Sequence, residues 1–373
     1  MIGFPSDGGL ATSGVTSTTV LGLSAVARCL DILTNGVSQC EWRERRGTLD
    51  LPLSRLVVRP HPALTRRDWT SFVVACLALF DRSYLLPTGG TDSEGVPLNL
   101  LPLDPSAVSA VTTSDLQWVS PLPADEYWVG HARVKRSDIV ILNRGPLPGV
   151  GESAMGIINL ARIKFAEALA ADGYSSRYWQ AGGPTDRALE TDANMPEPVA
   201  TQLSDRWAQR NMKGPDHVPV LSGGLKFKQY GVDPTAQSAV EARRELVADI
   251  GRYFGVPTRI LNAPTGDSET YTSSEAGNMD LVRYTLQNYI GAIEDAISDQ
   301  LPGGRRLVIE THKLTAGTQL AQAQALQLMT GNKAILDVDE AREMIGQPPV
   351  ENPELLNPPA PVPVIAASGG QNP

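Results

Sequence analysis

The chain has 373 residues, 42% hydrophobic and 20% charged, which fits a folded protein of two or three domains and argues against a disordered or fibrous chain. The net charge of -9 argues against a protein that holds nucleic acid through an overall basic surface. Three cysteines without metal-ligand spacing argue against a zinc site or a disulfide framework and fit a reducing compartment. No signal peptide pattern and no membrane-spanning apolar run is found, so we expect neither export nor insertion.

The first part of the chain indicates a flexible arm followed by a small α+β domain. Residues 1–19 are rich in Gly, Ser and Thr, which is typical of a mobile segment. Apolar spacing then predicts helices over 20–37 and 68–79. Short β-prone pieces bounded by turn residues follow at 83–86, 126–129 and 139–142.

The middle of the chain contains two predicted long helices with a module between them. A Gly- and Pro-rich turn at 145–151 precedes a helix predicted as one piece over 153–179. A second helix, predicted over 236–254, ends at Gly255-Val256-Pro257. The segment between them indicates a small inserted module, with a helix at 198–210 and strands at 218–221 and 225–230.

A third long helix is predicted over 279–301, where apolar residues keep the 3.6-residue period. A strand follows at 306–311, and further helices are predicted at 318–329 and 337–345. From residue 347 to 373 the prolines forbid a continuous helix, so we expect an extended tail.

A search for catalytic or metal-binding patterns finds none that is specific. The four histidines, at 61, 131, 217 and 312, lie far apart in the sequence and have no second ligand at a suitable spacing. The glycines of 145–156 lack the lysine of a nucleotide-binding loop, so a structural turn is favoured. We therefore predict no catalytic residue, no metal and no cofactor.

Charged segments leave two interpretations open. Paired arginines at 43/45/46, 66/67, 243/244 and 305/306 lie beside acids, which favours solvated faces or salt bridges between subunits over a DNA-reading surface. The segment 262–278 carries hydroxyls and acids but no Lys or Arg. It is either an ordinary exposed loop or a surface that touches a phosphate backbone without holding it.

The order of several motifs resembles the HK97-type family of phage portal proteins over roughly residues 23–314. The resemblance includes the segment 26–42, the Leu-Pro-Leu-Asp-Pro sequence at 101–105, and the strand, turn and long helix over 137–185. Its most specific part is the Phe-Gly-Val-Pro step at 254–257 with its flanking helices. One departure is Asp81-Arg82-Ser83-Tyr84, where family members commonly carry a Gly-Asn-Ala-Tyr-like sequence.

The resemblance implies an α+β portal fold assembled as a ring, usually of twelve subunits, with a reduced crown. It implies a flexible arm at 1–19, a wing at 20–152, stem helices at 153–180 and 234–256, and a clip at 181–233. It also implies a tunnel loop, long helix and wing strand within 257–314, short crown helices at 315–346 and a disordered tail at 347–373.

The implied function is a non-enzymatic channel at one capsid vertex, through which double-stranded DNA is packaged and ejected. The implied partners are further copies of the chain, the large terminase, the head–tail adaptor, the major capsid protein and passing DNA, without a membrane. The implied location is the virion, after assembly in the host cytoplasm. Competing interpretations are another head–tail connector or a DNA-processing enzyme.

The resemblance also assigns site residues. The tunnel loop beside DNA would comprise Asn262, Pro264, Thr265, Gly266, Asp267, Ser268, Glu269, Thr270, Tyr271, Thr272, Ser273 and Ser274. The partner-binding residues of the clip would be Lys213, His217, Lys226 and Lys228. Ring symmetry further implies that an isolated subunit exposes apolar surface.

Overall fold

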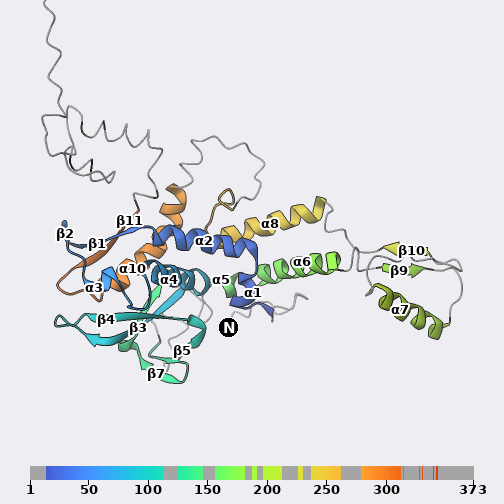
Figure 1. Cartoon of the computed structure of the whole chain (residues 1–373), viewed down its shortest axis with the longest axis horizontal. Helices are drawn as coiled ribbons and strands as arrows, with labels where there is room; N and C mark the ends of the chain where they lie inside the picture. Colours follow the sequence, from blue (N-terminus) through green and yellow to red (C-terminus); the bar gives the residue numbers. More distant parts are fainter. Residues whose placement is uncertain are drawn as a thin grey trace, which may run out of the picture. The chain divides into compact units, whose positions relative to one another are not determined.

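The computed structural model describes residues 14–111, 124–145, 156–180, 187–190, 196–211, 226–229, 237–261 and 279–311, and single residues at 314, 327, 330, 339 and 342. The chain divides into two compact units, Met1–Thr315 and Ala316–Pro373. The elements below all belong to the first unit (Figure 1). The predicted helices at 318–329 and 337–345 and the tail at 347–373 fall almost wholly outside the described residues.

The folded part begins earlier than predicted. Helix α1 (Ser17–Leu21) is capped by the Thr16 side chain, and Val15 and Val20 are buried in the core. The chain is therefore part of the folded body from about residue 14, because two valines find apolar neighbours that composition alone does not reveal. Helix α2 (Ser24–Ser38) follows after a break at Gly22, so the helix predicted over 20–37 consists of two pieces.

A three-stranded antiparallel sheet joins the two ends of the first unit in the order β11-β1-β2. Strand β1 (Glu41–Arg46) lies between β2 (Leu49–Leu51) and β11 (Arg306–Glu310). The inward positions of β1 are Trp42 and Glu44. Glu44 is fully buried and accepts hydrogen bonds from the Ser54 amide at 2.7 Å and the Arg305 Nη1 at 3.2 Å.

A second sheet has the order β4-β3-β8 and packs near α4. Helix α3 (Arg55–Val58) precedes α4 (Arg66–Phe80), which begins at the capping residue Thr65. Trp69 on α4 is fully buried, and its indole N–H donates to the carbonyl of Leu100 at 3.0 Å. The strands are β3 (Arg82–Thr91), β4 (Pro97–Leu103) and β8 (Val140–Asn143).

A third, smaller sheet has the order β5-β6-β7. Its strands are β5 (Val108–Val111), β6 (Glu126–Val129) and β7 (Ala132–Lys135), and short 3-10 turns flank it at Pro105–Ala107 and Arg136–Asp138. One face covers a separate small core made by Tyr84, Ala124, Tyr127 and Ile139. The rings of Tyr84 and Tyr127 lie 5.8 Å apart between centroids. The sequence pattern predicted β6 correctly but not β5 or β7.

The first long helix is broken, contrary to the prediction of one helix over 153–179. The described part contains α5 (Ile157–Leu160) and α6 (Arg162–Gln180), separated by Ala161 with φ -97° and ψ 18°. Gly156 explains where the first piece begins: its φ is 116°, and an added Cβ would lie 2.8 Å from the Phe80 Cα. This close approach to the end of α4 fixes the start of α5. The backbone then departs from helical geometry at Ala161 before α6 begins.

The second long helix, α8 (Gln237–Phe254), ends at Gly255 as predicted. The third differs from prediction, because residues Leu281–Leu286 form a π-helix (η6) ahead of α10 (Gln287–Ser298). The Thr285 hydroxyl donates to the Gly255 carbonyl at 2.6 Å. Apolar spacing cannot distinguish this wider turn from an α-helix over so short a stretch.

The inserted module contains β9 (Arg187–Glu190), α7 (Glu197–Asn211) and β10 (Lys226–Gln229), with β9 and β10 antiparallel. Its helix and the strand at 225–230 were predicted, β9 was not, and the strand predicted at 218–221 lies outside the described residues. No helix in the described ranges is long and apolar enough to cross a membrane.

Candidate functional site

The two helices that flank the inserted module lie side by side and run antiparallel (Figure 1). Two ion pairs join α6 to α8: Asp172 to Arg243 at 2.6 Å and Lys164 to Asp249 at 3.7 Å. The pair with the higher residue number on α6 has the lower residue number on α8. This order shows that the two helices are antiparallel. Because these side chains are largely exposed, each pair contributes little to stability.

Burial is concentrated at one end of this helix pair. Phe165 on α6 and Ile250 and Phe254 on α8 are buried in the main core. At the other end, residues 241–245 of α8 are all exposed, and so is Trp179 on α6. The pair is therefore anchored at one end, while the inserted module follows from the other.

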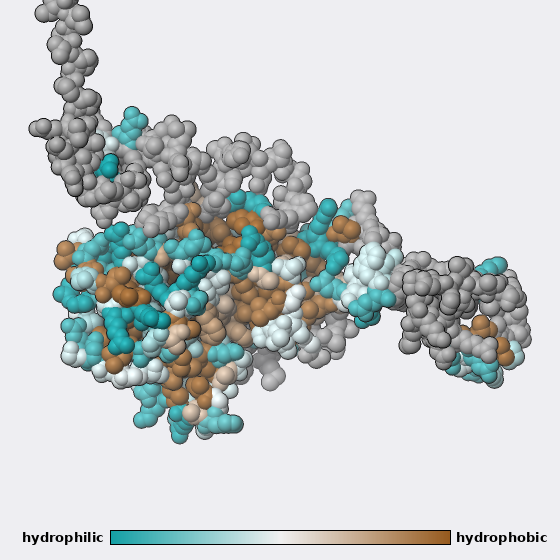
Figure 2. All heavy atoms as spheres, viewed as in Figure 1, coloured by the Kyte–Doolittle hydropathy of each residue, from teal (hydrophilic) through white to brown (hydrophobic). Residues whose placement is uncertain are grey.

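Several large apolar side chains are exposed in the first unit, and Figure 2 shows hydrophobic residues reaching its surface at more than one place. On and next to the helix pair these are Leu160, Ile163, Trp179 and Tyr253. Exposed apolar side chains of this size can be buried when another protein packs against them.

The predicted clip residues are brought together only in part. Lys226 and Lys228 both lie exposed on β10, two residues apart and hence on one face of the strand. Lys228 pairs with Glu190 on β9 at 3.4 Å, which partly balances the positive charge there. Lys213 and His217 lie outside the described residues.

The predicted tunnel-loop residues, from Asn262 to Ser274, also lie outside the described residues. The elements on either side of this segment are in contact with each other. An added Cβ on Gly255 would lie 2.9 Å from the Thr285 hydroxyl, so only glycine fits between the end of α8 and the π-helix.

Some arginines of the predicted clusters form ion pairs within the chain. Arg43 pairs with Asp50 and Glu310, both at 3.1 Å, and Arg45 pairs with the same two carboxylates. Hydrogen bonds from Arg45 and Arg43 lower the pKa of Asp50. Arg66 lies over the Trp42 ring, 5.5 Å from its centroid. These salt bridges are intramolecular, and the predicted salt bridges between subunits stay a prediction.

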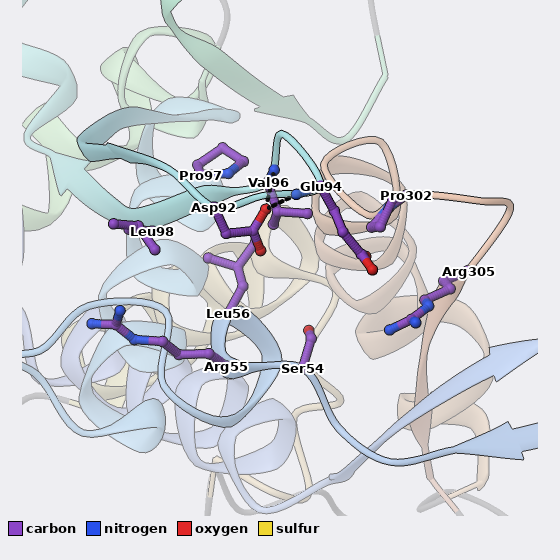
Figure 3. Close-up of a pocket in the computed structure, with 10 residues that line it drawn as sticks. All are labelled: Ser54, Arg55, Leu56, Asp92, Glu94, Val96, Pro97, Leu98, Pro302 and Arg305. Carbon is purple, nitrogen blue, oxygen red and sulfur yellow. Dashed lines mark hydrogen bonds between the residues drawn. The ribbon is translucent and has the colours of Figure 1, made fainter.

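A small cavity of about 110 Å³ lies where α3, the β3–β4 turn and the turn before β11 meet (Figure 3). The Asp92 carboxylate reaches toward it from one side and the Ser54 hydroxyl from the other, while Arg55 points away. One Asp92 oxygen already accepts from the amides of Glu94 and Val96 at 2.9 Å. The cavity has room for about three water molecules, so hydration is the chemistry it supports best.

The cysteines and acids of the described residues form no reactive group. Burial raises the pKa of Cys29 and Cys76 to about 12 and that of Cys40 to about 11. These thiols stay protonated at neutral pH and are poor nucleophiles. Within the described ranges, no three His, Cys, Asp or Glu side chains are grouped to hold a metal ion.

Comparison with known protein families gives one match over most of the chain. Residues 24–346 match the family described as phage portal protein. The chain belongs to the phage portal protein family. The resemblance to HK97-type portal proteins that the motifs predicted is thereby confirmed.

Individual portal proteins agree with this assignment. The portal protein of Enterobacteria phage HK97 is 25% identical over 373 residues, which cover 92% of this chain and 83% of the relative. A probable portal protein of Streptomyces phage phiC31 is 26% identical over 140 residues, 37% of this chain and 30% of the relative.

Solved structures share the portal fold at lower identity. An HK97 family phage portal protein from Corynebacterium diphtheriae has a TM-score of 0.61 and 16% identity, over 82% of this chain and 98% of that one. A chain in the neck of a native gene transfer agent particle, computed with C12 symmetry, has a TM-score of 0.57 and 19% identity, over 93% and 96%. At these identities, the structural similarity shows that this chain shares the fold of those proteins.

The exposed Trp128 on β6 of this portal-family chain was not predicted from the sequence. A signal was present, because Tyr127 and Trp128 are neighbours in a predicted strand and must point to opposite faces. Since Tyr127 is buried, the second aromatic has to face outward.

Proposed function

We propose that the chain is one subunit of a ring-shaped portal at a capsid vertex, through which double-stranded DNA is packaged and later ejected. The observation that carries the proposal is the family match over residues 24–346. The family is one of structural proteins, and the described residues present no catalytic grouping, so the work of DNA translocation is assigned to a separate motor.

The proposed ring contains about twelve subunits. Support comes from the C12 symmetry of the gene transfer agent neck, whose chain shares the fold. In a closed ring every subunit presents two different surfaces to its two neighbours. Such contacts would bury the apolar side chains that are exposed along α6 and α8.

The proposed arrangement within each subunit follows the portal fold. Residues 20–152 would form the wing, α6 and α8 the stem, and 181–233 the clip. The segment 262–274 would be the tunnel loop, and its lack of Lys and Arg suits a contact that lets DNA slide. Residues 315–346 would form the reduced crown, and the arm and tail would extend from the body.

The proposed partners act at different stages. The clip, with Lys213, His217, Lys226 and Lys228, would meet the large terminase during packaging and the head–tail adaptor afterwards. The major capsid protein would surround the ring in the virion, after assembly in the host cytoplasm.

Sedimentation and native mass measurement of the purified chain test this function. The proposal predicts a single closed assembly of about twelve chains without ATP hydrolysis. A stable monomer or dimer, or an ATPase intrinsic to the chain, would contradict it.

A further inference from the structure

The outer face of the β5-β6-β7 sheet is unlike an ordinary solvated sheet face. Cross-strand pairing places Ser109, Trp128 and Arg133 in one row and Val111, Glu126 and Lys135 in the next. The opposite face covers the small core around Tyr127. We call these six residues the Trp128 face; strands β5 and β7, which border it, are labelled in Figure 1.

Trp128 occupies the centre of this face. It lies on the central strand and is 39% exposed, although outward positions of a one-sided antiparallel sheet are usually polar. Within the described residues its indole stacks on no other ring, and its N–H meets no acceptor. Val111, in the neighbouring row, is also exposed, at 38%. The centre of the face is thus apolar and, among the residues that the structure describes, unpartnered.

Charged groups surround this apolar centre. Arg133 donates from Nε to the Glu126 carboxylate at 2.6 Å and from Nη2 to its other oxygen. This bidentate pair fixes the direction of the guanidinium, and Arg133 and Trp128 are cross-strand partners in register. Lys135 is exposed and forms no ion pair within the described residues. The face therefore carries one excess positive charge on a chain whose net charge is -9.

We propose that the Trp128 face docks an acidic protein segment that carries an apolar side chain. The apolar side chain would cover the indole, and carboxylates would meet Lys135 and the remaining N–H groups of Arg133. Trp and Arg at the centre of a patch are the residues that most often dominate the energy of protein interfaces. The proposal concerns a surface apart from the stem and clip and does not require the ring.

The chemistry of the face favours a protein segment over nucleic acid. Glu126 lies between Val111 and Lys135 and would repel a phosphate backbone. The face has only two cationic side chains, Lys135 and the already paired Arg133. Binding of nucleic acid there would release few counterions and so gain little affinity. A carboxylate-bearing peptide meets the same two cations with less repulsion, since its charges can be spaced to avoid Glu126.

Fluorescence anisotropy with a labelled Glu/Ser peptide that contains one central Leu tests the proposal. Four full-length proteins are compared: wild type, Trp128→Ala, Lys135→Glu and the control Leu49→Ala. The control removes a large apolar side chain, Leu49, that is 64% exposed on β2, outside the Trp128 face and the stem helices. All three substituted side chains are exposed, and circular dichroism checks that each variant is folded.

The proposal predicts binding by wild type and Leu49→Ala, and at least about tenfold weaker binding by Trp128→Ala and Lys135→Glu. A counterpart peptide with Lys in place of Glu should not bind. Equal binding by all four proteins, no binding by any, or preference for the Lys peptide or for a single-stranded oligonucleotide would overturn the proposal. None of these outcomes decides whether the chain forms a ring, because assembly is tested separately by mass measurement.

Discussion

Arg144 forms an ion pair with Asp81, its Nε 2.7 Å from the carboxylate Oδ1, and so ties the end of β8 to the end of α4. The same guanidinium donates from Nη1 to the Tyr289 hydroxyl on α10 at 2.9 Å and lies over its ring. Asp81 has a left-handed φ of 62°, a backbone conformation that favours glycine. A turn that glycine would adopt freely thus carries a carboxylate that joins three elements.

Replacing Arg144 by Leu should destabilise the protein strongly. The Asp81 side chain is only 9% exposed, so it would remain as a nearly buried charge without a partner. We expect a loss of about 3 kcal/mol in the free energy of unfolding, measured by urea denaturation. Asp81→Gly should cost less, because glycine suits the turn and leaves a partly exposed arginine. If the double variant lost the sum of both effects, the pair would not be coupled.

Glu294 should make stability depend on pH. Burial is the main reason that its pKa is raised, and the Ile309 amide, which donates to it at 2.6 Å, opposes the shift. A raised folded pKa means that the folded chain holds the proton more tightly than the unfolded chain does. This contribution is present at low pH and is lost as pH rises from the ordinary value of 4.5 through the folded pKa.

Glu294→Gln should therefore be more stable than wild type at neutral pH, since the amide oxygen still accepts from Ile309 without a buried charge. Glu294→Ala removes the acceptor and should cost about 1–3 kcal/mol. Both variants are checked by thermal unfolding between roughly pH 4 and pH 8, a range that covers the expected titration of Glu294. A Gln variant with the wild-type pH profile would show that Glu294 does not titrate in this way.

Two glycine substitutions should change stability in opposite directions. Gly156→Ala would place a Cβ 2.8 Å from the Phe80 Cα in a left-handed conformation, which should cost more than about 2 kcal/mol. Gly173→Ala lies within α6 with no atom within 4 Å of the added Cβ, and should stabilise by about 0.5–1 kcal/mol. Melting temperatures of the two variants should fall on either side of wild type, and a neutral Gly156→Ala would exclude the close approach of α5 to α4.

Thr285→Val should weaken the contact between the π-helix and the end of α8. The substitution keeps the branched shape but removes the hydroxyl that donates to the Gly255 carbonyl. We expect a loss of about 1 kcal/mol in the free energy of unfolding. Thr201→Val is a matched control, because the Thr201 hydroxyl bonds a carbonyl within its own helix α7. A larger effect in the control would rule out a specific role for Thr285.

The long helices were predictable from sequence because an apolar face repeats over several turns. Their interruptions were not, since the break before α6 and the π-turn before α10 depend on contacts of Gly156 and Thr285 with distant backbone. Strand β1 was missed because Glu44 is buried, and its partner Arg305 lies 261 residues away in the chain. Membership of the portal family was predicted from the order of motifs. The exposure of Trp128 was not predicted, although it follows from two neighbouring aromatic residues in one strand.

The most direct test of the portal account is a cryo-electron microscopy map of the purified, assembled chain. The account predicts a closed ring of about twelve subunits with a central hole that admits duplex DNA, walled by α6 and α8, with residues 262–274 at its narrowest part. A compact monomer or dimer would contradict the ring, and a ring with residues 262–274 on its outer rim would contradict the tunnel-loop assignment.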